Sequence, residues 1–137
     1  MRREQHRVVV ALLIWCAVLI LLYVSIGFVG GEDRSKCPYK TAGNPNASLS
    51  IKYFGNPFCI WCLIGNPKIE KLTEQKGKSF FMEYYDNRYC PAEVDRFGVS
   101  AIPFFVFNDT KQAVSYPGYL EDADMRSIIC QSTGDCE

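Results

Sequence analysis

The pattern of hydrophobic and polar residues divides this chain into three stretches. Residues 8–30 contain no charged side chain, and at about 1.5 Å per residue a helix of that length crosses a bilayer core. Residues 31–47 mix Gly, Pro, Asn and charged residues, as linkers and irregular lead-ins do. The pattern therefore predicts a transmembrane helix over residues 8–30, a linker over 31–47 and one domain over residues 48–137.

The domain alternates between two kinds of secondary structure. Short runs rich in β-branched and aromatic residues predict strands over residues 48–54, 79–85, 102–107 and 112–116. Helices are expected over residues 59–76, 91–97 and 121–130. In the first helix Pro67 should cause a kink, and the apolar face is assigned to Leu63, Ile64, Ile69 and Leu72. This order of elements predicts an α/β sandwich with a central mixed sheet.

The flanks of the apolar run predict its orientation. Residues 1–7 carry three arginines and the only histidine, whereas residues 31–36 mix acidic and basic side chains. The positive-inside rule then places residues 1–7 in the cytoplasm and the domain outside it, in an extracellular, periplasmic or lumenal space. A cleaved signal peptide is the alternative, although the run is longer than a usual h-region and no A-x-A site follows it. Either alternative places the domain outside the cytoplasm.

Charge and cysteine content narrow the classes of function. Lys and Arg total 15, as do Asp and Glu, and this balance argues against a nucleic-acid binder, which needs a basic face. Seven cysteines are many for 137 residues, and in an oxidising compartment they indicate structural disulfides or disulfide chemistry. Asn46 and Asn108 each begin an N-x-S/T triplet and are candidate glycan acceptors, with unmodified polar loops as the alternative.

Cys59 and Cys62 form a C-x-x-C motif between a predicted strand and a predicted helix. Such a pair can cycle between dithiol and disulfide, or it can share a metal ion. Zinc takes four ligands, but the chain has one C-x-x-C, and its only histidine precedes the apolar run. The sequence therefore favours thiol chemistry, and we expect no metal and no other cofactor.

Several positions together resemble the thioredoxin superfamily. The C-x-x-C opens a helix, and Pro67 follows it at the place where thioredoxins kink that helix. Residues 97–103 resemble the aromatic-Gly-apolar-x-x-Ile-Pro segment that leads to the cis-proline of the superfamily. Pro91 and Gly118 are similarly placed. The resemblance covers residues 48–130 and implies a thioredoxin-like fold.

The resemblance also implies roles for the residues of the motif. Cys59 would be the exposed nucleophile, activated by the helix N-terminus, and Cys62 the buried resolving thiol. Pro103 would be cis and would leave the backbone of Ile102 free to pair with a substrate strand. The expected partners are proteins with thiols or disulfides, together with a membrane or soluble redox partner that recycles the pair.

The chain departs from the superfamily at the site itself. Tyr53 stands where thioredoxins carry a buried carboxylate, and Phe58 replaces the tryptophan before the first cysteine. The central dipeptide, Ile60-Trp61, brings no positive charge to hold a thiolate, so we expect a less oxidising site than in His-containing oxidases. Trp61 is expected either to grip an apolar substrate segment or to pack against the adjacent loop.

Four more cysteines lie beyond the apolar run and allow three pairings: Cys37, Cys90, Cys130 and Cys136. A local bridge between the last two is the simplest, and it would leave the first two to tie the lead-in to the short helix. Structural bridges are expected, and a pair that relays electrons to the C-x-x-C is the alternative. The leading hypothesis is a membrane-anchored thiol–disulfide oxidoreductase. The alternative is a non-catalytic thioredoxin-like binding module in which Cys59–Cys62 is a structural bridge.

Overall fold

The computed structural model describes residues 12–20 and 32–136. The chain divides into two compact units, Met1–Glu32 and Asp33–Glu137. In the first unit residues 12–20 are helical, and the rest of the predicted transmembrane segment lies outside the described residues. Within residues 12–20 and 32–136, no helix combines the length and the apolar character needed to cross a membrane. The anchor stays a prediction.

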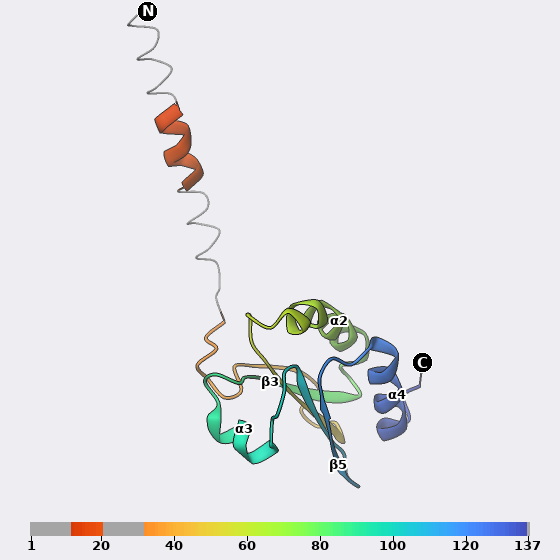
Figure 1. Ribbon diagram of the computed structural model, residues 1–137. Helices are drawn as coiled ribbons and strands as arrows, with labels where there is room; N and C mark the ends of the chain where they lie inside the picture. The colour runs from red at the N-terminus through yellow and green to blue at the C-terminus, as the bar shows by residue number, and fades with distance from the viewer. Residues whose placement is uncertain (1–11, 21–31, 137) are drawn as a thin grey trace, which may run out of the picture. The chain divides into compact units, whose positions relative to one another are not determined.

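The second unit is built on a five-stranded mixed sheet with the strand order β1-β3-β2-β4-β5 (Figure 1). Its two central strands, β2 (Leu49–Gly55) and β3 (Phe80–Asp86), run parallel. The three remaining strands pair antiparallel with their neighbours: β1 (Lys40–Gly43), β4 (Phe104–Asn108) and β5 (Ala113–Pro117). The mixed sheet confirms the predicted α/β sandwich.

Helices cover both faces of this sheet. On one face α2 (Ile60–Lys76) and α4 (Asp122–Thr133) pack on the larger core cluster, which includes Leu49, Ile51 and Tyr53 of β2. On the other face α3 (Pro91–Phe97) contributes Val94 and Phe97 to a smaller cluster. The alternation along β2 produces this division, because successive side chains of a strand point to opposite faces.

The strand β1 corrects the prediction of an irregular lead-in over residues 31–47. Lys40 pairs with Tyr84 and Gly43 pairs with Phe81 at the edge of the sheet. Gly43 has a φ of +87°, and a Cβ at this position would lie 2.3 Å from the carbonyl oxygen of Phe80. Only glycine allows the strand to end in such close contact with its neighbour. This strand is short and polar, and it is stabilised by contacts that are distant in sequence.

The apolar face predicted for α2 was wrong at two positions. Ile69 and Leu72 are buried as expected, but Leu63 is 51% exposed and Ile64 is 45% exposed. The buried stripe instead begins at Cys62 and continues, at spacings of three and four residues, through Gly65, Ile69, Leu72 and Lys76. The first turns of α2 therefore present apolar side chains to solvent next to the C-x-x-C motif.

An ion pair with a buried carboxylate stabilises the turn that follows β3. Asp86 is fully buried, and its two carboxylate oxygens accept hydrogen bonds from Arg88 at 2.9 and 2.6 Å. Burial alone would raise the pKa of Asp86, but the hydrogen bonds from Arg88 outweigh it and hold this pKa below its ordinary value. The ionised carboxylate therefore stabilises the folded protein.

We expect Asp86→Asn to lower the free energy of unfolding at pH 7 by about 1.5–3 kcal/mol, the usual contribution of hydrogen bonds to a charged group. Because the folded pKa is depressed, this stability is present above the unfolded value, about pH 4, and is lost as the pH falls through the folded value. Urea unfolding at pH 7 and at low pH measures the effect. A difference between the two proteins that stays constant down to low pH would contradict the assignment.

Candidate active site

The site is built where β2 ends and α2 begins. Asn56 turns the chain, because its side-chain oxygen accepts a hydrogen bond from the backbone N–H of Phe58 at 2.9 Å. Cys59 is the N-cap of α2, and its Sγ accepts a hydrogen bond from the backbone N–H of Cys62 at 3.2 Å. The cysteine sulfur thus takes the place of a capping hydroxyl. Free N–H groups and the partial positive charge of a helix N-terminus both favour a thiolate there.

The two cysteines of the motif are joined by a disulfide, and their Cα atoms are 5.2 Å apart. Cys59 is half-buried, whereas Cys62 is 1% exposed. An incoming thiol or disulfide can therefore reach the first sulfur but not the second. This difference in access suits a nucleophilic Cys59 and a resolving Cys62.

The segment before β4 lies against the first cysteine. The Ile102–Pro103 peptide bond is cis, and Pro103 is buried. The carbonyl oxygen of Ile102 lies 3.7 Å from Cys59 Sγ. On the far side of the proline, Gly118 donates its N–H to the carbonyl oxygen of Pro103 at 2.7 Å. The backbone of Ile102 therefore lies within reach of anything that is bonded to Cys59.

Two polar side chains lie behind Cys62, and the sequence analysis singled out Tyr53 but not Asn66. The hydroxyl of Tyr53, which is 1% exposed, donates a hydrogen bond to Asn66 Oδ1 at 2.7 Å. A Cβ at Gly55 would lie 2.8 Å from this hydroxyl oxygen and 3.1 Å from Cys62 Sγ. The hydroxyl and the sulfur therefore face the same small space. The spacing of four residues between Cys62 and Asn66, which places both on one face of α2, was the available signal.

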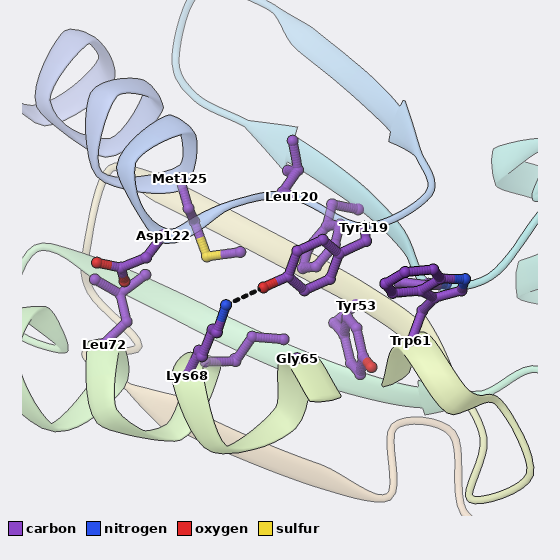
Figure 2. Close-up of a pocket in the computed structure, with 12 residues that line it drawn as sticks. Tyr53, Trp61, Gly65, Lys68, Leu72, Tyr119, Leu120, Asp122 and Met125 are labelled. Carbon is purple, nitrogen blue, oxygen red and sulfur yellow. Dashed lines mark hydrogen bonds between the residues drawn. The ribbon is translucent and has the colours of Figure 1, made fainter. Parts of the chain in front are cut away.

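Trp61 packs against the adjacent segment, and its role in gripping a substrate stays a prediction. Its ring centre lies 5.9 Å from that of Tyr119, so it packs against the segment before α4, yet 55% of its surface stays exposed. Figure 2 shows Tyr119 between Trp61 and Lys68, whose ammonium group donates a hydrogen bond to the tyrosine hydroxyl. Trp61 is thus held on one side and open on the other.

Exposed apolar side chains surround the disulfide. Within residues 33–136, the large hydrophobic side chains that stay exposed are Phe58, Ile60, Trp61, Leu63, Ile64 and Tyr89, here called the apolar collar. The guanidinium group of Arg88 lies 5.0 Å from the ring centres of both Phe58 and Tyr89, and so links them across the surface. An apolar surface of this kind is typical of a site that receives another protein.

Four of the five other cysteines form two disulfides outside the C-x-x-C, and Cys16 is free. Cys37 is bonded to Cys90, with a Cα–Cα distance of 5.8 Å, and Cys130 is bonded to Cys136, with a distance of 4.5 Å. These are the pairs that the sequence analysis treated as simplest. The first ties the lead-in to the N-cap of α3, and the second closes the chain after α4.

Other predicted sites lie apart from this region. Asn46, in the turn between β1 and β2, and Asn108, at the end of β4, are both exposed. Their use as glycan acceptors stays a prediction. Among residues 12–20 and 32–136, no group of three or more His, Cys, Asp or Glu side chains is placed to hold a metal ion.

Comparison with solved structures identifies the fold of the second unit. No protein-family model matches the sequence, and no curated protein matches it. Chloroplastic thioredoxin z is similar in structure, with a TM-score of 0.60 and 20% identity over 65% of this chain and 81% of that one. A mutant thioredoxin from Halobacterium salinarum has a TM-score of 0.58 and 20% identity over 64% of this chain and 76% of that one. Mitochondrial thioredoxin 3 from Saccharomyces cerevisiae has a TM-score of 0.56 and 18% identity over 63% of this chain and 80% of that one. The second unit therefore has the thioredoxin fold.

Proposed function

We propose that this protein is a thiol–disulfide oxidoreductase that reduces, forms or exchanges disulfides in other proteins. The observation that carries the proposal is the difference in access at the C-x-x-C: Cys59 caps α2 at the surface, and Cys62 lies buried behind it. The fold supports it, because the structural neighbours are thioredoxins and the cysteine pair of this chain lies at disulfide distance.

The reaction follows from these positions. In the reducing direction the Cys59 thiolate attacks a substrate disulfide, a bond forms between Cys59 and one substrate sulfur, and the other substrate sulfur leaves as a thiolate with the electron pair. Cys62 then attacks Cys59, the mixed disulfide breaks, and the second substrate sulfur leaves. The substrate gains two electrons and the protein ends with the Cys59–Cys62 disulfide. Formation of a substrate disulfide runs through the same steps in reverse.

The surface around the site supports proteins as substrates. The apolar collar offers contact area beyond the two sulfur atoms, and the backbone of Ile102 lies beside Cys59. An extended segment that carries a cysteine can lay its backbone along Ile102 and its apolar side chains on Trp61 and its neighbours. A small thiol would use neither feature.

We further propose that residues 8–30 anchor the protein in a membrane, with the catalytic domain outside the cytoplasm. The uncharged run and the arginines before it support this orientation. The two disulfides beyond the C-x-x-C suit an oxidising compartment. There a membrane or soluble redox partner returns the pair to its working state.

Turnover of insulin, whose chains are joined by disulfides, tests the proposal with the full-length protein in detergent and dithiothreitol as electron donor. We expect catalysed reduction, and Trp61→Ala should raise KM about fivefold, which corresponds to a loss of about 1 kcal/mol of apolar contact. Reaction of the variant with oxidised glutathione should stay unchanged, as should both reactions in the control Gln131→Ala. A protein that binds insulin without reducing it would instead be a binding module.

A further inference from the structure

The interior behind Cys62 contains a polar pair that the reaction described above does not use. Tyr53, on β2, and Asn66, one turn of α2 after Cys62, are joined by a hydrogen bond of 2.7 Å. A Cβ added at Gly55 would lie 2.8 Å from the tyrosine hydroxyl oxygen and 3.1 Å from Cys62 Sγ. The hydroxyl that is bonded to the Asn66 amide oxygen therefore lines the same small space as the resolving sulfur.

We propose that Tyr53 is a positioning residue for the resolving thiol. The single hydroxyl hydrogen of Tyr53 turns between Asn66 and Cys62 as the redox state changes. In the disulfide form, the sulfur of Cys62 is a weak acceptor, and the Tyr53 hydroxyl donates its hydrogen bond to Asn66 Oδ1. When Cys62 is a thiolate, a charged acceptor faces the hydroxyl, and hydrogen bonds to charged acceptors are about twice as strong as neutral ones. Asn66 is only half-buried, so water can replace the hydrogen bond that it loses.

This inference rests on the proposed function, since it concerns the second step of that reaction. There the Cys62 thiol gives its proton to water and becomes the thiolate that attacks Cys59. The new Cys59–Cys62 bond forms, the bond to the substrate breaks, and the substrate sulfur takes the electron pair and then a proton from water. Tyr53 donates a hydrogen bond to the thiolate and transfers no proton itself.

The surroundings keep the tyrosine neutral through this cycle. Burial raises the pKa of Tyr53 far above its ordinary value, Tyr39 and Tyr84 raise it further, and Arg34 offsets only part of this. The carboxylate of Asp86 lies in the strand position that pairs with Gly55, but its oxygens bind Arg88. The hydroxyl therefore acts as a donor of a hydrogen bond over the whole working range of pH.

The rigid packing of Tyr53 makes the hydroxyl a fixed point. Its ring packs edge-on against Tyr84 with centres 5.7 Å apart, and it is tilted against Phe105 with centres 5.1 Å apart. Rotation about the C–O bond turns the hydrogen away from Asn66 without any movement of the ring. A side chain at Gly55 would contact both the hydroxyl and the sulfur.

The titration of the Cys62 thiol tests the proposal, using the ultraviolet absorbance of the thiolate in the full-length protein. The background is Cys16→Ser with Cys59→Ser, which leaves Cys62 as the one thiol outside the two remaining disulfides. Tyr53→Phe should raise the pKa of Cys62 by about one to two units, a ten- to hundredfold loss of thiolate at fixed pH. The matched control Tyr84→Phe, which also removes a buried tyrosine hydroxyl, should leave this titration unchanged.

Variants of Asn66 give a second test that does not depend on the folding of Tyr53→Phe. In Asn66→Asp a stronger acceptor competes with Cys62 for the hydrogen bond from the Tyr53 hydroxyl, so this variant should raise the pKa of Cys62. In Asn66→Ala the competing acceptor is gone, so this variant should lower the pKa of Cys62 or leave it unchanged. A titration unmoved by Tyr53→Phe, or moved in the same direction by both Asn66 variants, would overturn the proposal. The titration does not depend on turnover. If the protein shows these shifts in the pKa of Cys62 but reduces no insulin, the proposed function is refuted and the inference about Tyr53 stands.

Discussion

We expect turnover to fall to the uncatalysed background when Cys59 is replaced by serine, and the reaction to stop at a mixed disulfide when Cys62 is replaced by serine. Cys59 is the half-buried cap of α2 and holds the only sulfur of the pair that a substrate can reach. A serine hydroxyl there stays protonated at neutral pH and cannot attack a disulfide. Cys62, at 1% exposure, takes part only after the first bond has formed.

Insulin reduction measures the first effect, and intact mass under non-reducing conditions measures the second. For Cys62→Ser we expect a covalent adduct with one substrate chain that dithiothreitol releases. The control is the double variant Cys130→Ser/Cys136→Ser, which removes a disulfide outside the site and should keep its turnover. Full turnover by Cys59→Ser, or an adduct that forms equally well on both single variants, would refute the assigned roles.

We expect removal of the disulfide between Cys37 and Cys90 to lower the free energy of unfolding by about 4 kcal/mol, and removal of that between Cys130 and Cys136 to lower it by about 2 kcal/mol. The reason is the entropy of the unfolded chain, since the first bridge closes a loop with a sequence separation of 53 and the second one of 6. Cys90 also lies in the smaller core cluster at 1% exposure, so a serine hydroxyl there adds to the cost.

Urea unfolding of the two double serine variants, with the Cys59–Cys62 pair kept oxidised, compares these losses directly. Each double variant also carries Cys16→Ser, so that no unpaired thiol remains and disulfide exchange does not complicate the result. Equal losses, or a larger loss for the Cys130–Cys136 variant, would show that strain or residual structure outweighs loop entropy in this domain.

Much of the fold could be predicted because its buried strands carry their own pattern. Leu49, Ile51 and Tyr53 alternate with more polar residues, and all three are buried in the larger core cluster. The strand β1 has no comparable pattern, and its place depends on pairing with β3 and on the bridge from Cys37 to Cys90. Contacts so distant in sequence leave no local signal in four polar and small residues.

The candidate site could also be predicted only in part from the sequence. The motif Cys59–Cys62 was predicted from its residue types and spacing, and the cis Ile102–Pro103 peptide was predicted from the resemblance to the thioredoxin superfamily. The contact between Tyr53 and Asn66 depends on how closely a helix packs on a strand, which the sequence does not report. The apolar collar was missed because Leu63 and Ile64 were assigned to the buried face, although the stripe that packs on the sheet begins at Cys62 and Gly65.

The reduction potential of the Cys59–Cys62 pair tests the central claim most directly. The full-length protein in detergent is equilibrated with defined ratios of reduced and oxidised dithiothreitol, and the fraction of oxidised pair is read from thiol labelling and intact mass. We predict reversible two-electron reduction with a midpoint between about −270 and −120 mV, the range from thioredoxin to a strong oxidase, and nearer its lower end because Ile60 and Trp61 carry no charge. A pair that stays oxidised below about −300 mV is a structural bridge, and that result would contradict the account.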